Sequence, residues 1–558
     1  MHGRLTRLFH TARHLRLQQV YGQVRRRIAT TSPLSFPGKG DCAPAYPGCR
    51  WSHPKNFLAP ATQGLAADEI RRGRFRFLNI SQKTGFPPRW DCDNPSRLWQ
   101  YNLHYFDWLW VLDYGSGRQA VLDWIRGYAG GGGCVGWEPY PVSLRIMNWC
   151  GYFFGRFRGR TQSDREFCLA LWDSVYRQCT WLSTHLETQL LNNHYLENAA
   201  ALVFAGGCFY GRQADRWLNK GLPILTKQVS EQVLSDGMHF ELSPMYHCRI
   251  LYVLVLLMGT DIPAVKELLA EPVYRMARAL QRLCHPDGRI ALLSDSAMDV
   301  YHEPGDLLSY IRRRWPSLSL PEDQYGCFAL PDSGYYGWQG TDGTYVIADY
   351  GRIGPDHCPG HGHADIFSFE LSVKGHRVIV DTGVHDYEPS DARNYCRSTA
   401  AHNTVEVEGQ DQCELWGAFR VARRGYPRDI TWCAGENGFT LSGRHDGYRR
   451  LPGAPEHSRR MDWDADGGLT VRDRITSTRP VHCVSRLHLH PDCRVTDLHG
   501  RAVEIACPDA NLRVEGDSEI TVEETPYFER FYETQSRSSL CMHGEGTRAE
   551  MRYSIRIH

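Results

Sequence analysis

Three polar residues stand together in an otherwise apolar stretch of the sequence, Asn192, Asn193 and His194, and Glu197 follows them closely. Two amides, an imidazole and a carboxylate cost desolvation free energy on burial unless they are partnered. Taken alone, the segment favours a helix capped by Asn192 with a hydrogen-bonded histidine in the core, because Asn is a preferred N-cap residue. The alternative is a polar cluster with a chemical function.

A tyrosine and an arginine form the second candidate, within the segment Asp236–His247 and just after it. The segment closes a loop and opens a helix, with Pro244 near the first turn. Tyr246 and Arg249 are three residues apart, so they lie on one helical face. A cation beside a phenol lowers its pKa, as proton transfer near neutral pH requires. An aromatic contact at a helix start is the competing interpretation.

The densest group of metal-binding residue types contains His361 and His363, with Asp381 and His402 further along. Alternate residues of a strand share a face, so both histidines of a His-x-His pair point the same way. Neutral imidazoles and a carboxylate are ligands that Zn²⁺ prefers, at about 2.0–2.2 Å. The pattern indicates a metal site, and a hydrogen-bonded histidine cluster is the alternative.

Two hydrophobic periods divide the chain that must position these residues. From about Leu98 to Cys284 apolar residues recur every three or four positions, which predicts helices in a bundle, an array or an α/α toroid. After about Pro321 the period changes to two, which predicts closely spaced antiparallel strands packed as a sandwich. We therefore expect two domains joined near residues 314–325, with a ligand cleft between them.

Composition excludes several classes of function. The 558 residues carry 64 Lys+Arg against 63 Asp+Glu, a net charge of +1, which argues against an electrostatic scaffold for nucleic acid or for an anionic membrane surface, so any anionic partner must be met locally. The longest apolar stretch, Ile250–Met258, has about half the length that a bilayer crossing needs. Residues 1–28 are basic and amphipathic without a secretory pattern, and the 19 scattered cysteines favour reduced thiols. The sequence itself therefore favours a cytoplasmic protein without a membrane span.

The candidate residues resemble those of the heparinase II/III-like polysaccharide lyases. The likeness is strongest over His361–Thr404 (H-G-H-A-D-x-x-S-F-E-L, V-D-T-G, R-S-T-A-A-H-N-T), good at Asn192–His194 and Asp236–His247, and looser over Trp99–Trp149. The resemblance implies an incomplete α/α toroid followed by an antiparallel β-sandwich. The implied parts are an N-terminal extension with helices leading into the toroid over 1–90, the toroid over 91–320 and the β-sandwich over 326–558.

The resemblance also implies catalytic roles. Asn193 and His194 look like the pair that neutralises a uronate carboxylate. Tyr246 looks like the tyrosine that acts as Brønsted acid, sometimes also as base, and His361 like the histidine that assists at the +1 sugar. The implied reaction removes the C5 proton of a 1,4-linked uronate, expels the O4 sugar and leaves a 4,5-unsaturated end.

A structural metal and a second tyrosine follow from the same resemblance. His363, Asp381 and His402 look like the zinc ligands of those relatives that hold a structural metal. Some members use a second catalytic tyrosine, for which Tyr395 or Tyr387 is available in this sequence. The identity of the base therefore stays open.

Further residues are expected to contact the glycan. Aromatic side chains stack on sugar faces, and arginines pair with acidic groups, although core packing is the commoner fate of such aromatics. The candidates are Asn192, Arg249, Arg145, Trp137, Tyr105 and Trp99.

Two other functions remain open at this point. A glycoside hydrolase on an α/α toroid would use paired carboxylates, for which Glu138, Glu197, Asp236 and Glu241 are available. A non-catalytic glycan-binding or exopolysaccharide-assembly protein would keep the cleft without turnover. The sequence does not identify the glycan or the oligomeric state. The compartment stays open too, because many members of the family that the sequence resembles are secreted or periplasmic.

Overall fold

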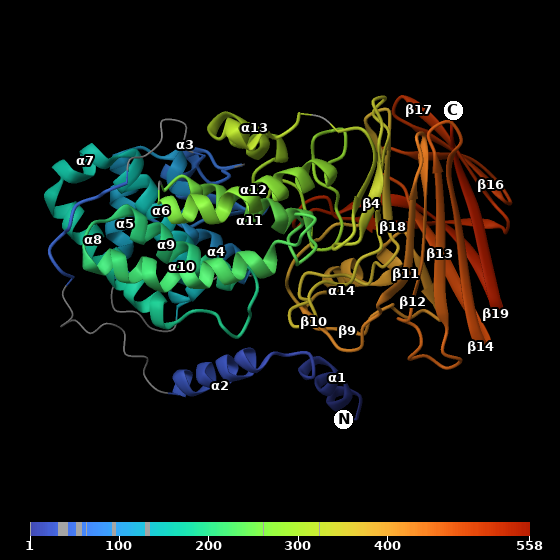
Figure 1. The fold of residues 1–558 in the computed structure, drawn as a ribbon, viewed down its shortest axis with the longest axis horizontal. Coiled ribbons are helices and arrows are strands. Elements are labelled where there is room, and N and C mark those ends of the chain that lie inside the picture. Colours follow the sequence, from blue (N-terminus) through green and yellow to red (C-terminus); the bar gives the residue numbers. More distant parts are fainter. Residues whose placement is uncertain are drawn as a thin grey trace.

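The computed structural model describes residues 2–31, 43–51, 58–62, 64–91, 96–128, 134–260, 262–322 and 324–558. Within them, a helical half is followed by a half of antiparallel sheets, and the two halves lie side by side along the long axis (Figure 1). The helix α13 (Pro304–Arg314) ends the helical half, and the strand β3 (Gly326–Leu330) begins the other. The change of element type thus falls where the hydrophobic period changes.

The helical half packs mostly antiparallel helices around two central ones, α9 (Asn193–Cys208) and α11 (Pro244–Met258). Every residue of α11 is buried, as expected for a helix that is apolar all round. Helices α6 and α10 pack against α9, and α12 packs against α11. The other helices are α3 (Ala67–Arg71), α4 (Arg97–Tyr105), α5 (Tyr114–Tyr128), α6 (Pro139–Trp149), α7 (Arg158–Ser163), α8 (Arg165–Thr184), α10 (Arg212–Gln232) and α12 (Pro263–Arg282).

Both central helices begin with a side-chain cap. The Asn192 side chain accepts from the His194 amide at 3.1 Å, and the Ser243 hydroxyl accepts from the Tyr246 amide at 3.2 Å. Pro244 occupies the first turn of α11, where its missing N–H costs nothing. The caps place His194 and Tyr246 in the first turns of α9 and α11.

Two large sheets packed face to face make up most of the β half, and β9 and β10 pair separately. The smaller sheet has the order β3-β4-β5-β6-β7, and the larger follows the path β11-β12-β13-β14-β19-β17-β16-β15 with open edges. One apolar core joins side chains of both sheets, such as Phe369 and Leu441, which makes the half a sandwich. The strands are β4 (Tyr335–Gln339), β5 (Tyr345–Asp349), β6 (Phe369–Val373), β7 (His376–Ile379), β8 (Val405–Val407), β9 (Leu415–Trp416), β10 (Arg420–Val421), β11 (Pro427–Ala434), β12 (Gly438–His445), β13 (Glu456–Asp464), β14 (Gly468–His488), β15 (Arg494–His499), β16 (Ala502–Cys507), β17 (Ala510–Gly516), β18 (Ile520–Tyr527) and β19 (Gln535–Ile557), with one helix, α14 (Asp391–Arg397).

The N-terminal part contains one element that the sequence does not predict. Strands β1 (Arg74–Phe77) and β2 (Ile80–Lys83) form a hairpin whose turn residues Leu78 and Asn79 both have positive φ. The R-F-R-F alternation buries Phe75 and Phe77, which is the period of a strand. Four alternating residues are too short a pattern to predict a strand within a part of the sequence that is expected to be helical.

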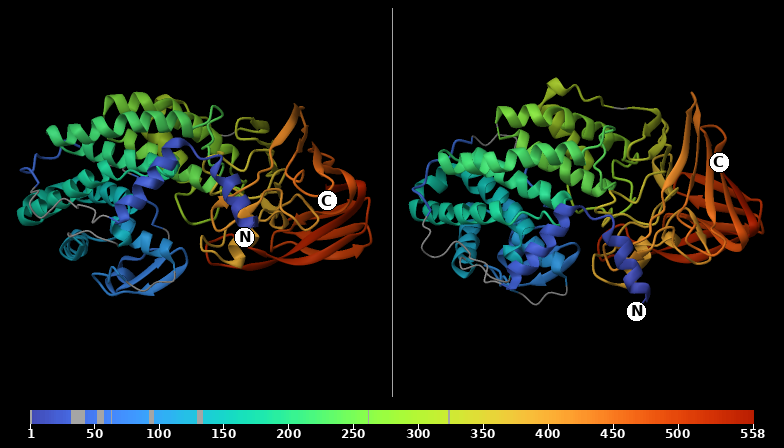
Figure 2. Two further views of the ribbon diagram at one scale, coloured as in Figure 1. Left: turned by 90° about the horizontal axis from the view of Figure 1, so that it is seen from below. Right: turned by 60° about the horizontal axis from the view of Figure 1, so that its bottom comes forward.

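Two further helices, α1 (His2–Ala12) and α2 (Leu17–Thr31), run along one side of the molecule and contact both halves (Figures 1 and 2). In the part of the chain that the structure describes, no helix combines the length and the apolar character needed to cross a bilayer.

Candidate active site

Tyr246 lies where the two halves meet. Its ring stacks on His361 with centroids 3.9 Å apart, and its hydroxyl lies 3.1 Å from that of Tyr387. Tyr246 belongs to α11, whereas His361 and Tyr387 belong to loops of the β half. The contact therefore joins one helix of the first half to two loops of the second.

Glu241 connects this contact to the start of α9. Its Oε1 accepts from the Asn193 amide at 3.0 Å, and its Oε2 lies 3.8 Å from His361 Nε2. Burial raises the pKa of Glu241. Asn193 and His361 therefore lie on either side of one carboxylate, with His194 next to Asn193 in the chain and Tyr246 stacked on His361.

The Asn193 side chain has open hydrogen-bonding capacity. It is buried, yet neither its Nδ2 nor its Oδ1 has a hydrogen-bond partner among the described residues. Buried amides are almost always partnered, and an exception calls for an explanation such as a ligand. The amide thus has open hydrogen-bonding capacity, although it is buried and does not line the neighbouring cleft.

His194 is held toward its charged form. Its Nδ1 donates to Glu187 at 3.2 Å, and its ring stacks on Tyr140 with centroids 3.9 Å apart. Burial alone lowers the pKa of His194, but the carboxylates of Glu187, Glu197 and Glu241 raise it above its ordinary value. An imidazolium next to an open amide forms a receptor for a carboxylate.

The two phenols differ in how easily they ionise. Burial raises the pKa of both Tyr246 and Tyr387 well above the usual range. The hydrogen bond between them raises the pKa of Tyr246 further and lowers that of Tyr387. Arg393, whose guanidinium lies 5.0 Å from the Tyr387 ring centroid, also lowers the pKa of Tyr387. Tyr246 is thus held protonated, and Tyr387 carries negative charge more readily.

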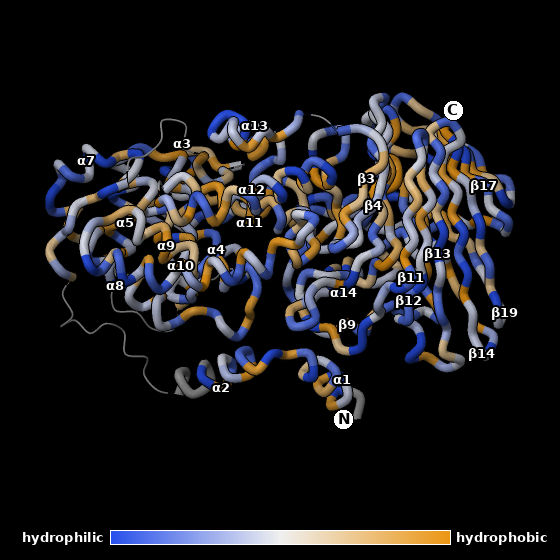
Figure 3. The backbone as a smooth tube through the Cα atoms, viewed as in Figure 1, coloured by the Kyte–Doolittle hydropathy of each residue, from blue (hydrophilic) through white to orange (hydrophobic). Residues whose placement is uncertain are grey.

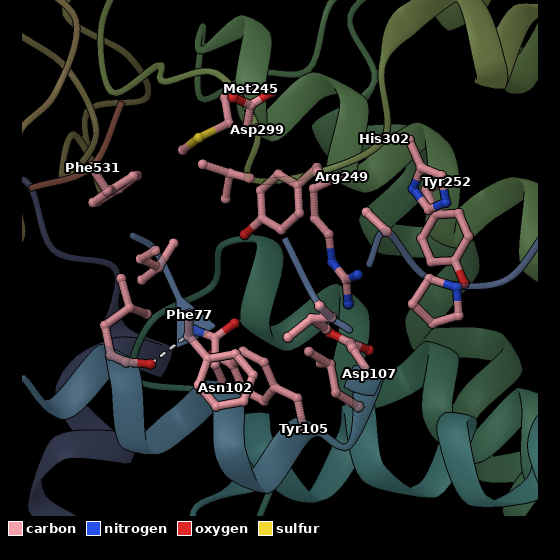
Figure 4. A pocket seen from close by; sticks show the side chains of 18 of the residues that line it. Phe77, Asn102, Tyr105, Asp107, Met245, Arg249, Tyr252, Asp299, His302 and Phe531 are labelled. Carbon is pink, nitrogen blue, oxygen red and sulfur yellow. Dashed lines mark hydrogen bonds between the residues drawn. The ribbon is translucent and has the colours of Figure 1, made fainter. Parts of the chain in front are cut away.

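A cleft opens beside this cluster. Tyr105, Tyr140, Tyr246, Arg249 and Tyr387 are among its lining residues. Most of the labelled side chains in Figure 4 come from α4, from α11 and from the loop after α12, all in the helical half. Phe531 is contributed by the β half. Tyr105, which the sequence offered as a glycan contact, therefore lines this cleft.

Arg249 lines the cleft but does not act on Tyr246 as the spacing suggested. Its Nε and Nη2 donate to the two oxygens of Glu197 at 3.2 and 2.6 Å, and Tyr140 donates to the same carboxylate at 2.8 Å. The predicted lowering of the Tyr246 pKa by a cation is wrong, because the Arg249 charge is neutralised and burial dominates.

Three predicted glycan contacts are corrected by burial. Trp99 is fully buried and donates to the Ile80 carbonyl, and Trp137 packs among other tryptophans of the core. Arg145 is also fully buried; it donates to Gln178 at 2.8 Å and lies over the Trp124 ring. None of the three lines the cleft, because the core of the helical half uses their apolar and planar surfaces.

Two further predicted residues lie beside the site rather than in it. Asn192 caps α9, which is the structural alternative that the sequence favoured. Tyr395 lies on α14 with its ring centroid 6.3 Å from that of Phe528, and it does not line the cleft. Of the two candidate second tyrosines, Tyr387 is the one that contacts Tyr246.

Asp295 is a functional candidate that the sequence did not reveal. Its carboxylate accepts from His361 Nδ1 at 2.8 Å, from His363 Nε2 at 2.9 Å and from the Arg393 guanidinium. Asp295 lies 66 positions before His361, so no local motif marks the pair. Glu187 and Tyr140 were missed for the same reason, since each meets His194 only through the fold.

The predicted metal ligands form a compact buried cluster. His363, Asp381 and His402 offer ligand atoms that all lie within 4.8 Å of one another. His402 Nδ1 donates to Asp381 at 2.9 Å, whereas His363 Nδ1 and His402 Nε2 have no hydrogen-bond partner among the described residues. Two open imidazole nitrogens beside a carboxylate fit the donor set of Zn²⁺.

Comparisons with known proteins agree with this architecture. The family model described as heparinase II/III N-terminus matches residues 123–306, and the one described as heparinase II/III-like, C-terminal, matches residues 323–556. A heparinase III structure superposes with a TM-score of 0.68 at 18% identity, covering 84% of this chain and 79% of that one. A heparan sulfate lyase mutant from Pedobacter heparinus gives a TM-score of 0.65 at 20% identity, covering 88% and 82%. The predicted fold class, helical half and antiparallel sheets, is confirmed.

Curated relatives include proteins with different names. A heparin-sulfate lyase of Pedobacter heparinus is 28% identical over 302 residues, which are 49% of this chain and 44% of that protein. The chain thus spans less than half the length of this lyase. FtsZ-localized protein C of Caulobacter vibrioides is 27% identical over 454 residues, which are 75% of this chain and 74% of that protein.

Proposed function

The chain belongs to the heparinase II/III-like family, and we propose that it is a polysaccharide lyase that cleaves a uronate-containing glycan of the glycosaminoglycan class by β-elimination. The open Asn193 amide next to the charged His194 is the observation that carries this proposal. Relatives named heparin-sulfate lyase support the substrate class.

The first requirement of this reaction is to quench the uronate charge. A proton α to a carboxylate is hard to remove while the carboxylate keeps its full negative charge. Asn193 and His194 would donate to the carboxylate as charge builds on it, and one preorganised donor of this kind contributes about 2.7–4 kcal/mol. Both side chains are set by the capped first turn of α9, so little reorganisation is needed.

The second requirement is to move two protons. Tyr387 would take the C5 proton as the base in its phenolate form; burial and Asp295 raise the pKa of Tyr387, and Arg393 and the hydrogen bond with Tyr246 offset part of that rise. Tyr246, which stays protonated, would give its proton to the departing O4 of the sugar. The bond from C4 to O4 breaks as the C4–C5 double bond forms, and the 3.1 Å hydrogen bond between the phenols lets the proton return.

A panel of heparan sulfate, chondroitin sulfate, hyaluronan, alginate and acidic bacterial exopolysaccharides tests the proposal. Unsaturated uronate ends absorb in the ultraviolet, so cleavage of a panel member should produce absorbance that rises with time. New reducing ends without this absorbance would instead demonstrate hydrolysis.

The four carboxylates named above for the hydrolase alternative do not provide a free pair. Glu197 is committed to Arg249, and Glu138 accepts from Arg97 and Tyr101. Asp236 accepts from the Ser333 amide at 2.7 Å and shapes a loop. Only Glu241 of the four keeps an open oxygen near the cluster, and inverting or retaining hydrolysis needs two carboxyl groups.

A second candidate function is non-catalytic. The relative that shares 75% of this chain is named for its localisation with FtsZ rather than for a reaction. A protein that retains the site for binding alone would bind a uronate oligosaccharide without producing unsaturated ends. Calorimetry on the same glycan panel separates binding from turnover.

We also propose that His363, Asp381 and His402 hold a structural Zn²⁺, whose chemistry would be to lock three loop residues of the β half together. Elemental analysis of the purified protein should find about one zinc per chain. His402→Ala should lower both the zinc content and the Tm. A metal-free protein with an unchanged Tm after chelation would contradict this assignment.

A further inference from the structure

The first helix of the chain exposes apolar side chains. Leu5, Leu8 and Phe9 of α1 are spaced by three and four residues, so they form one stripe, and each is between 43% and 66% exposed. A surface helix of a globular protein normally turns such a stripe toward the core.

The second helix repeats the pattern. Leu17, Val20, Tyr21 and Val24 of α2 follow the spacing i, i+3, i+4, i+7 and are between 44% and 89% exposed. Seven of the thirteen exposed large apolar side chains in the described residues fall within residues 5–24. Figure 3 shows hydrophobic and hydrophilic segments alternating along both helices.

The face of α2 that contacts the protein is its polar one. Gln19 is buried and donates to the Leu190 and His357 carbonyls at 3.1 and 3.0 Å. Gly22 lies so close that an added Cβ would be 2.9 Å from the Gln189 amide nitrogen. The orientation of α2 is therefore set by close polar contacts, and the apolar stripe faces outward because of them.

The two helices are anchored to both halves of the molecule. Arg7 pairs with Glu414 at 3.2 Å in the β half, and Arg16 pairs with Glu231 on α10. The Thr11 hydroxyl donates to the Val421 carbonyl at 3.2 Å. The helices thus form a fixed ridge along one side of the protein, as the views in Figure 2 show.

The ridge is also strongly basic. Residues 1–40 contain seven arginines and no aspartate or glutamate, although the whole chain is nearly neutral. Arginines that flank an exposed apolar stripe match a surface that combines negative headgroups with an apolar interior. A second copy of the same ridge would bring like charges together, which disfavours self-association through this face.

We propose that α1 and α2 dock the protein on an anionic lipid bilayer. The helices would lie in the plane of the interface, with the stripes Leu5–Phe9 and Leu17–Val24 among the acyl chains and the arginines other than the anchoring Arg7 and Arg16 at the phosphates. The cleft would then be held at a constant distance from the membrane surface. This inference is independent of the reaction proposed above.

Vesicle flotation tests the docking. The full chain is mixed with phosphatidylcholine vesicles that contain or lack phosphatidylglycerol, and the floated fraction is measured. We expect flotation with the anionic vesicles only, weaker at high salt, and a loss of more than about tenfold in the double variant Leu17→Glu, Tyr21→Glu. The same variant should keep its Tm and its lyase activity on soluble oligosaccharides, because both side chains are exposed.

Matched controls come from elsewhere on the surface. Leu169 and Leu498 are 46% and 43% exposed, so Leu169→Glu and Leu498→Glu add the same charge away from the ridge and should float like the parent protein. Absence of flotation with anionic vesicles, or full flotation of the double variant, would overturn the proposal. So would a dimer in solution that the double variant dissociates while vesicles bind neither protein.

Discussion

The protein buries one cluster of histidine and carboxylate side chains in the β half and another where the halves meet, and the two clusters differ in how completely they are hydrogen-bonded. In the β half, His445 Nε2 contacts His457 Nδ1 at 3.0 Å, and His457 Nε2 donates to Asp473 at 2.8 Å. Arg459 donates to both oxygens of the same Asp473 at 2.7 Å. Every ring nitrogen of the two histidines has a partner.

The cluster between the halves is left incomplete. Asn193 keeps two open amide atoms and Glu241 one open oxygen among the described residues. Saturated polar networks rigidify a core, whereas an unsaturated one costs free energy that only a ligand can return. The comparison separates a fully hydrogen-bonded cluster that supports the fold from an open one at which we propose that the substrate binds.

The largest effect is expected from the phenol that donates a proton. Tyr246→Phe removes the hydroxyl and leaves the packing on His361, so the rate of unsaturated-end formation should fall about 10²–10⁴-fold at an unchanged Tm. The control is Tyr252→Phe, on the same helix and in the same cleft, which should cost less than about tenfold. Equal losses in both variants would contradict the assignment of Tyr246.

A substitution in the fully hydrogen-bonded cluster of the β half should lower stability and leave the rate of turnover unchanged. Arg459→Ala strands the buried Asp473 charge, so the free energy of unfolding should drop by about 3–5 kcal/mol. Chemical denaturation measures this drop, and the kcat of the protein that remains folded should be near the parental value. A stable but inactive Arg459→Ala protein would break the distinction between the clusters.

Asn193→Ala sharpens the same distinction at the site. The side chain has no internal partner to lose, so stability should stay within about 1 kcal/mol while kcat falls about 10²–10³-fold. Steady-state kinetics and thermal unfolding measure the two quantities together. A large loss of stability would show that Asn193 supports the fold instead.

The smallest expected effect concerns pH. The pKa of His194 is raised by Glu187, Glu197 and Glu241, so its charged form persists below that raised value and is lost as the pH rises through it. Glu187→Gln removes one of the three carboxylates and should move the alkaline limb of the kcat/KM profile to lower pH. An unmoved limb would indicate that another group controls it.

Local signals in the sequence predicted the type and order of the elements well. The change of hydrophobic period located the border between the halves, and Ser243 with Pro244 marks the start of α11. His363, Asp381 and His402 could be grouped from the sequence because they lie within 40 residues of one another, in neighbouring segments of the β half.

Contacts between distant segments could not be predicted in the same way. Arg249 is one turn from Tyr246, but its partner Glu197 comes from another helix and cancels its charge. Trp99 and Trp137 have aromatic side chains of the kind that stack on sugars. They are buried because of how the helices of the helical half pack, which the sequence does not show. Asp295 shows no pattern because its three partners come from a loop and a helix of the other half.

The hydrogen bond between Tyr246 and Tyr387 spans the border between the halves, and this has a mechanical consequence. Sliding one half along the other by little more than an atomic diameter would part the two hydroxyls and stop the relay, with both halves intact. The rate of turnover would then depend on how the halves are aligned. A compound that separates the halves would stop turnover without contacting the residues proposed to bind the sugar acid.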